Sequence, residues 1–192
     1  MESYRTLLVD AFTTEPLAGN AAGVVPDADG LSEEQMQAIA RELSVSETAF
    51  LLPSTEADRK VRYFTPTQEV DLCGHATIAA HGALFDDGAI DAGSYTLETE
   101  VGVLDIDVTE TGAVWMTQNA PQIFEVELDY AEAADALGID EAAFRDVGAD
   151  LPPAYASTGL PFLLLPVNFL EHLSAMEPDY DAVATLAEKH DT

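Results

Sequence analysis

Glu47 is a candidate for an acid/base catalyst because of its position in the sequence. It lies between Ser46 and Thr48, at the point where a turn gives way to the apolar run 49–52. A carboxylate beside such a run is partly removed from water, which raises its pKa toward values that suit proton transfer. A solvated turn glutamate is the alternative, and on position alone it is the more frequent outcome.

A second group of reactive side chains opens a helix that we expect over residues 75–86. Cys73, Gly74 and His75 stand at its start, and its other residues are apolar on nearly every face. A helix of that kind is usually buried, and this one is too short to span a membrane. Free backbone N–H groups and the positive end of the helix dipole at its start favour an anion such as a carboxylate.

Each of these residues has a structural alternative. His75 suits a hydrogen bond to a substrate carboxylate or to a neighbouring acid, but equally a bond to the backbone. Cys73 precedes a helix N-terminus, a setting that lowers a thiol pKa and permits a role as base; a buried structural cysteine is at least as frequent. His75 and His81 are six positions apart rather than four, so we predict no metal site.

The apolar patterning predicts alternating strands and helices. Residues 102–108 alternate strictly from Val103, which indicates a strand with one buried face. Ser32 and Gln35 form a capping box before a helix over 33–43, and Gly138 ends another over 130–137. Gly19 and Asn20 suit a tight turn, since both tolerate positive φ. Further strands are expected over 5–12, 21–25, 49–52, 59–64, 95–98, 113–118, 155–157 and 162–167, and further helices over 141–144 and 180–189.

A connector that begins at Pro121 separates two regions of the pattern. We place a first domain over residues 1–122 and a partial second domain over 123–192.

The charge of the chain is far from balanced. Against 36 acidic residues stand 7 basic ones, for a formal net charge of -29, while 47% of residues are hydrophobic. Nothing supplies a basic patch, so we expect neither nucleic acid nor a membrane surface as a partner. The acids are spread among ordinary apolar segments, which favours a salt-adapted (halophilic) globular protein over a disordered tail.

One cysteine excludes an internal disulfide and fits the reducing cytoplasm, where we expect the protein. No signal peptide or transmembrane segment is expected. The sequence lacks G-x-G-x-x-G and G-x-S-x-G, so neither a dinucleotide site nor a hydrolase triad has an anchor.

Five short motifs, in order, resemble the phenazine biosynthesis PhzF-like family of the diaminopimelate epimerase-like superfamily. They are Val9-Asp10-Ala11-Phe12 with Gly19-Asn20, Ser46-Glu47-Thr48-Ala49-Phe50, Phe64-Thr65-Pro66 with Glu69-Val70, Cys73-Gly74-His75-Ala76-Thr77, and Ser157-Thr158-Gly159-Leu160-Pro161-Phe162. Each alone is weak, and together they are specific.

The resemblance implies an α+β fold in which a mixed or antiparallel sheet curls around a central helix. It implies an isomerase or epimerase that needs no cofactor and moves a proton on a small carboxylate-bearing metabolite. Glu47 matches the catalytic glutamate, while Gly74 and His75, with Ser46 and Asn20, match substrate-binding positions. Cys73 takes the place of a thiol base in related racemases, but a second cysteine is absent, so a two-thiol mechanism is excluded.

One departure from the family concerns its second half, which carries a segment resembling E-D-P-x-T-G-S with a catalytic aspartate. Nothing after Thr158 matches that segment, so we expect an incomplete second half. The alternative function is therefore a truncated, non-catalytic half that needs a partner chain to form the active site. A homodimer or a complementing chain is expected to cover the unfinished sheet.

Overall fold

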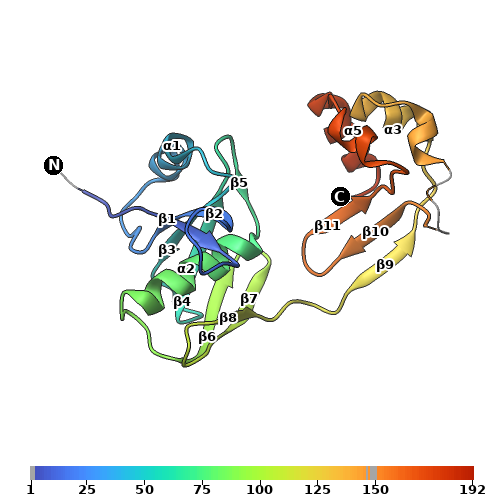
Figure 1. Cartoon of the computed structure of the whole chain (residues 1–192). Helices are drawn as coiled ribbons and strands as arrows, with labels where there is room; N and C mark the ends of the chain where they lie inside the picture. Colours follow the sequence, from blue (N-terminus) through green and yellow to red (C-terminus); the bar gives the residue numbers. More distant parts are fainter. Residues whose placement is uncertain (1–2, 146, 148–150) are drawn as a thin grey trace. The chain divides into compact units, whose positions relative to one another are not determined.

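The computed structural model describes residues 3–145, 147 and 151–192, and the chain divides into two compact units (Figure 1). The first unit ends at Gln118 and the second begins at Asn119. The sequence pattern had suggested a boundary four residues later, between residues 122 and 123. Among the helices in the described part of the chain, none is both long and apolar enough to cross a membrane.

The first unit is a mixed sheet curled around one helix, which confirms the predicted α+β fold class. Helix α2 contacts strands from both ends of the sheet, namely β1, β2 and β3 at one end and β7 and β8 at the other. The sheet order is β1-β2-β3-β4-β6-β7-β8, and β5 pairs with β4. The elements are β1 (Leu7–Ala11), β2 (Asn20–Val25), α1 (Glu33–Leu43), β3 (Thr48–Leu52), β4 (Arg59–Phe64), β5 (Glu69–Val70), α2 (Gly74–Asp86), β6 (Gly93–Thr99), β7 (Gly102–Val108) and β8 (Val114–Met116).

Two neighbouring pairs in this sheet are parallel, β2 with β3 and β4 with β6, and each is joined through a helix. Phe50 and Phe64 pack against Met36 of α1 in one apolar cluster, whereas Tyr63 bonds to Thr77 of α2. Successive side chains of a strand point to opposite faces. The two helices therefore cover opposite faces, and the central strand β3 is buried along almost its whole length.

Helix α2 is enclosed, as its apolar composition predicts. The buried Tyr63 hydroxyl donates to Thr77 Oγ1, and Thr77 Oγ1 donates in turn to the Cys73 carbonyl oxygen at 2.7 Å. These two bonds tie the start of α2 to β4. Burial raises the pKa of Tyr63 well above its usual value, so the phenol stays protonated and remains a donor.

The capping box at Ser32 is confirmed. The Gln35 N–H donates to Ser32 Oγ, and the Ser32 N–H donates to Gln35 Oε1 at 2.8 Å. Helix α1 ends at Ser44, which adopts a left-handed conformation with φ 55°. Both ends of α1 are thus fixed by local sequence, which leaves Glu47 a short and defined distance beyond the helix.

The first strand and its loop differ from the sequence-based expectation. Strand β1 stops at Ala11, because Phe12 turns to a φ of 65°. In this loop the residues with positive φ are Phe12 and Leu17, and Gly19 is not among them. The prediction that Gly19 serves to allow a positive φ was therefore wrong. A Cβ at Gly19 would lie 2.3 Å from the Ala11 carbonyl oxygen, so lack of space is what requires glycine.

The second unit holds a three-stranded antiparallel sheet in the order β11-β10-β9. Leu163 packs with Ala133, Phe144 and Leu186 of the helices, while Phe162 on the other face is exposed. The elements are β9 (Gln122–Glu125), α3 (Tyr130–Leu137), the 3-10 helix η1 (Glu141–Phe144), β10 (Ala154–Ser157), β11 (Pro161–Leu164), α4 (Leu170–Ser174) and α5 (Tyr180–Lys189).

Two elements of this unit were not predicted. Strand β9 occupies most of the expected connector, and α4 lies in a stretch to which no helix was assigned. Strand β11 ends at Leu164 rather than at Val167. The predicted end of the helix α3 at Gly138 is confirmed, since Gly138 adopts a left-handed cap with φ 66°.

Candidate active site

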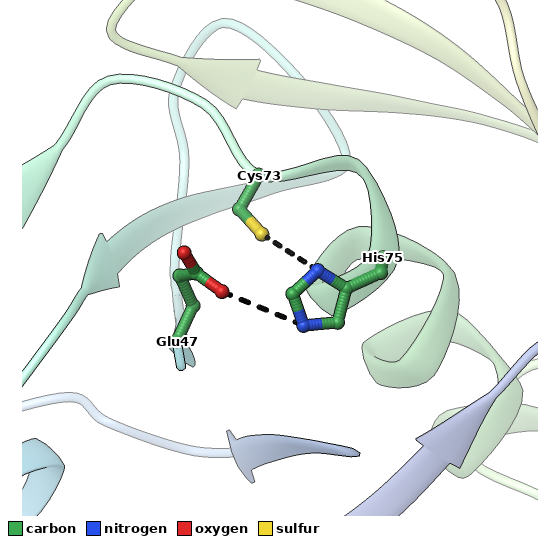
Figure 2. A group of neighbouring side chains, drawn as sticks. All are labelled: Glu47, Cys73 and His75. Carbon is green, nitrogen blue, oxygen red and sulfur yellow. Dashed lines mark hydrogen bonds and ion pairs between the residues drawn. The ribbon is translucent and has the colours of Figure 1, made fainter. Parts of the chain in front are cut away.

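Strand pairing explains why Glu47 and Cys73 lie together although 26 positions separate them. Strands β3 and β4 are antiparallel, and Thr48 at the start of β3 is opposite Phe64 at the end of β4. The residue before β3 and the turn after β4 therefore meet at one end of the sheet. Helix α2 begins at the same end, and Figure 2 shows Glu47 facing its first turn.

His75 joins the other groups of this cluster through both of its ring nitrogens (Figure 2). Its Nε2 lies 3.5 Å from Glu47 Oε2 and 3.4 Å from Ser46 Oγ. Its Nδ1 lies 3.2 Å from Cys73 Sγ. A protonated thiol is a donor, so Nδ1 accepts and the ring carries its hydrogen on Nε2, the nitrogen that contacts Ser46 Oγ and the Glu47 carboxylate.

The expectation of a lowered thiol pKa at Cys73 was wrong. The pKa is raised to about 11, chiefly because the side chain is buried and also because the Glu47 carboxylate is close. The N–H of Ala76 acts in the opposite direction but does not prevail. The sequence left a buried structural cysteine open as the alternative, and the structure shows that the side chain of Cys73 is buried. At neutral pH the thiol is protonated and is a poor base.

Gly23 positions the backbone of Glu47, and the sequence analysis overlooked it. Its N–H donates to the Glu47 carbonyl oxygen at 2.9 Å. A Cβ on Gly23 would lie 2.5 Å from Thr48 Oγ1 and 2.8 Å from Leu43 Cδ1, so only glycine fits. A glycine inside the apolar run of a strand marks a close approach of backbone, and that signal was present in the sequence.

Gly74 is the first residue of α2 and is half-buried. A Cβ there would meet Met116 Cε at 3.6 Å and Gln118 Nε2 at 3.8 Å, ordinary contact distances, so nothing in the protein itself demands a glycine. Because glycine has no side chain, a ligand can approach the backbone closely at this position.

The structure does not bring Asn20 into this cluster. Asn20 is the exposed first residue of β2, where it pairs with Ala11. Within the described part of the chain, it forms no hydrogen bond or ion pair with Glu47, Cys73 or His75. Ser46, by contrast, is exposed but bonded to the ring of His75.

The same cluster has the donor set of a metal site. Glu47, Cys73 and His75 each offer one ligand atom, and these atoms lie within 4.8 Å of one another. The two nitrogens of the imidazole face different groups, Nδ1 toward Cys73 and Nε2 toward Glu47. The ring would therefore have to rotate before a single ion could contact all three residues. His81, the other histidine of α2, is buried and donates from Nδ1 to the Thr77 carbonyl oxygen at 3.0 Å.

The arrangement suits proton transfer to and from a small molecule. The Glu47 side chain retains 24% of its exposure and that of His75 11%, so a reacting atom can approach the carboxylate. Helix α2 has no acidic residue in its first turn, and Glu47 from the neighbouring element takes that place. His75 Nε2 lies 3.5 Å from Glu47 Oε2, close enough for the imidazole to help hold the carboxylate in place.

Comparison with known proteins places the chain in a family. The family model of phenazine biosynthesis-like proteins (PhzC-PhzF) matches residues 9–191, and the chain belongs to that family. An uncharacterized isomerase, YfhB of Bacillus subtilis, is 39% identical over 183 residues, which cover 93% of this chain and 61% of that protein. A trans-2,3-dihydro-3-hydroxyanthranilate isomerase of Pseudomonas chlororaphis is 34% identical over 190 residues. These residues cover 95% of this chain and 64% of that protein.

Solved structures agree with the fold. A PhzF-family phenazine biosynthesis protein of Bacillus anthracis superposes with a TM-score of 0.75 at 40% identity, over 93% of this chain and 60% of that one. A hydroxyproline epimerase of Agrobacterium vitis shares the fold alone, with a TM-score of 0.54 at 19% identity over 83% of this chain and 50% of that one. The chain thus spans about three fifths of the length of the relatives it matches.

Proposed function

We propose that this protein is an isomerase or epimerase that moves a proton on a small carboxylate-bearing metabolite by acid/base catalysis without a cofactor. The observation that carries the proposal is the Glu47 carboxylate held beside the imidazole of His75 at the start of a buried helix. Relatives named as isomerases support it.

In the proposed mechanism, Glu47 takes a proton from one substrate carbon and returns it to another. His75 helps to hold the carboxylate in position through Nε2. The backbone at Gly74 and the positive end of α2 bind the substrate carboxylate, since free N–H groups and the helix dipole favour an anion there. Ser46 contributes its hydroxyl. Asn20, which forms no bond with the cluster, contacts the substrate directly from the start of β2 in this proposal. Cys73 stays protonated as a donor to His75.

Replacement of Glu47 tests this mechanism. In molar salt and deuterated water, the wild-type protein should transfer solvent deuterium into trans-2,3-dihydro-3-hydroxyanthranilate or another small unsaturated amino-hydroxy acid. Glu47→Gln keeps the shape but loses the base, so exchange should fall by roughly 100-fold or more. Mass spectrometry of the recovered substrate measures it.

Glu42→Gln is the matched control, because it removes one carboxylate from the exposed last turn of α1 and should leave exchange unchanged. Equal exchange by the Glu47 and Glu42 variants would show that the assignment of the base is wrong.

A second candidate is a non-catalytic half that forms an active site only with further polypeptide. It is favoured by the coverage, about three fifths of each matched relative, and by the location of the whole cluster in the first unit. The isolated chain would then show no exchange until that polypeptide is supplied. Exchange by the pure chain would exclude this candidate.

A further inference from the structure

The cluster at the start of α2 brings three different metal-ligating atoms together. Glu47 offers a carboxylate oxygen, Cys73 a sulfur and His75 a ring nitrogen, and these atoms lie within 4.8 Å of one another (Figure 2). The expectation of no metal site rested on the spacing of His75 and His81 along one helix. The three ligands come instead from two segments that strand pairing brings together, and helical spacing does not reveal such a set.

The distances within the cluster suit a tetrahedral ion. Zinc binds sulfur at about 2.3 Å and nitrogen or oxygen at about 2.0–2.2 Å, which places neighbouring ligand atoms about 3.4–3.6 Å apart. His75 Nε2 already lies 3.5 Å from Glu47 Oε2, and His75 Nδ1 lies 3.2 Å from Cys73 Sγ. The widest separation is at most 4.8 Å, so the three ligand atoms have to approach one another by only about 1 Å.

The imidazole of His75 can make this adjustment. Its contacts with Glu47 and Ser46, at 3.5 Å and 3.4 Å, are longer than an ordinary hydrogen bond, so rotation of the ring sacrifices little interaction energy. The outer torsion of a histidine side chain is also broad, because it joins an sp³ carbon to an sp² carbon. A rotated ring directs one nitrogen to an ion that the carboxylate and the sulfur contact as well.

The chemistry of the three ligands selects the class of ion. Thiolate and imidazole favour zinc, whereas magnesium and calcium prefer oxygen ligands. A thiolate and a carboxylate together carry two negative charges, which a divalent cation neutralises. Within the described residues, Glu47 forms no ion pair with a lysine or an arginine. The backbone N–H of Ala76 donates toward Cys73 Sγ, and such a bond supports a metal-bound thiolate.

We propose that Glu47, Cys73 and His75 form a reversible binding site for Zn²⁺. The thiol proton leaves to solvent when the sulfur binds, and water completes the tetrahedron on the side where Glu47 is exposed. An ion held there occupies the carboxylate that would take the substrate proton, so it inhibits the site. That consequence rests on the proposed function, whereas the binding itself does not.

Cobalt absorption tests the site directly, with Co²⁺ as a spectroscopic substitute for zinc. In molar salt and without added thiols, one equivalent of Co²⁺ should produce the near-ultraviolet charge-transfer band of a sulfur–cobalt bond and the intense visible bands of a tetrahedral ion. The sulfur can be assigned because Cys73 is the only cysteine in the chain. Zn²⁺ should bleach both sets of bands, whereas a large excess of Mg²⁺ or Ca²⁺ should not.

Ligand variants and a control complete the binding measurements. Cys73→Ser removes the sulfur and should lower the zinc affinity, measured by calorimetry, by more than about 100-fold, beyond the cost of losing a group that only supports a ligand. Glu47→Gln and His75→Ala should each lower it by at least about tenfold. Glu42→Gln removes an exposed carboxylate of α1 and should bind zinc as the wild type does. If Cys73→Ser lost its folded near-ultraviolet circular dichroism, Cys73→Ala would serve in its place.

The exchange assay of the proposed function measures inhibition. Zinc should suppress solvent-deuterium exchange by the wild-type protein over the concentration range in which it binds, and a chelator should restore the exchange. If the wild-type protein shows no exchange without zinc, the proposed function fails, and the cobalt and calorimetric results still decide the binding.

Absence of binding would overturn the zinc site. Binding without the sulfur band, or binding that Cys73→Ser retains, would place the ion on surface carboxylates and overturn the site too. Exchange that continues unchanged with zinc bound would overturn the inhibition.

Discussion

At the scale of single residues, the site depends on which groups around the His75 ring donate hydrogen bonds and which accept them. Cys73 faces one nitrogen of the ring and Glu47 the other. The thiol donates only while it is protonated, and its raised pKa keeps it so at neutral pH. The position of the Glu47 carboxylate is thus coupled, through His75, to the protonation state of the Cys73 thiol.

Alkylation of Cys73 measures this thiol. Its pKa of about 11 leaves a far smaller fraction of thiolate at pH 8 than an ordinary cysteine has, so iodoacetamide should react on the order of 100-fold more slowly than with the same thiol in unfolded protein. The rate should rise with pH until about pH 11. Mass spectrometry follows the reaction, with the protein in concentrated urea as control. A rate that levels off below pH 9 would contradict the buried, protonated thiol.

The sequence revealed which residues to examine here but not how they interact. Glu47 and His75 could be singled out because their motifs are short and contiguous. The contact between their side chains could not be predicted, because it depends on strand pairing between distant segments. The error over the pKa of Cys73 has the same origin, since the local helix start argues for a lowered value and tertiary burial reverses it.

At the scale of elements, Gly23 and Tyr63 hold the two parts of the site in place. Gly23 fixes the backbone of Glu47, and Tyr63 fixes the start of α2 through Thr77. Neither contacts a reacting atom. They act as positioning residues on β2 and β4, elements that carry none of the side chains of Glu47, Cys73 and His75.

Gly23→Ala should disturb stability and site together. The added methyl group would overlap Thr48 Oγ1 and Leu43 Cδ1, so the free energy of unfolding should fall by about 1–3 kcal/mol, the usual cost of overpacking a core. Denaturant titration in molar salt measures that loss.

The displaced Glu47 should also lower the rate of solvent-hydrogen exchange in the Gly23→Ala protein that remains folded. Ala22→Gly is the control, because it also alters a buried residue of β2 but adds no atoms. A Gly23→Ala protein as stable as the wild type would show that β2 and β3 can separate freely.

Elements with strong local signals were predicted well. Helix α1 has a capping box and α3 has a glycine cap, and both agree with the structure. Strand β9 was missed because all four of its residues are exposed, so it lacks the alternation of burial that identifies a strand. Helix α4 is only five residues long, too short for a helical period to appear.

At the scale of the whole molecule, excess negative charge dominates. Within the residues that the structure describes, five of the seven lysine and arginine side chains form ion pairs with acids, namely Arg5, Lys60, Arg62, Arg145 and Lys189. These pairs still leave the formal net charge at -29, because most of the 36 acids have no cation to pair with.

The thermal midpoint should therefore rise steeply with potassium chloride. Between about 0.1 M and 1 M salt the screening length falls from roughly 10 Å to 3 Å, which removes most of the repulsion between surface carboxylates. Circular dichroism on heating gives the midpoint. A double variant, Glu34→Gln with Glu42→Gln, removes two exposed carboxylates and should need less salt for the same midpoint. A midpoint independent of salt would contradict salt adaptation.

The directions of the strands in the first unit also bear on which face of the sheet each helix covers. Both crossovers, β2-α1-β3 and β4-α2-β6, step the same way along the sheet, but β2 and β4 run in opposite directions. Right-handed crossovers, the form that L-amino acids favour, then place α1 on the convex face and α2 on the concave face. Glu47 closes the first crossover and His75 lies in the second. The meeting of carboxylate and imidazole is thus a product of backbone chirality: a left-handed second crossover would carry His75 to the convex face and leave Glu47 without its partner.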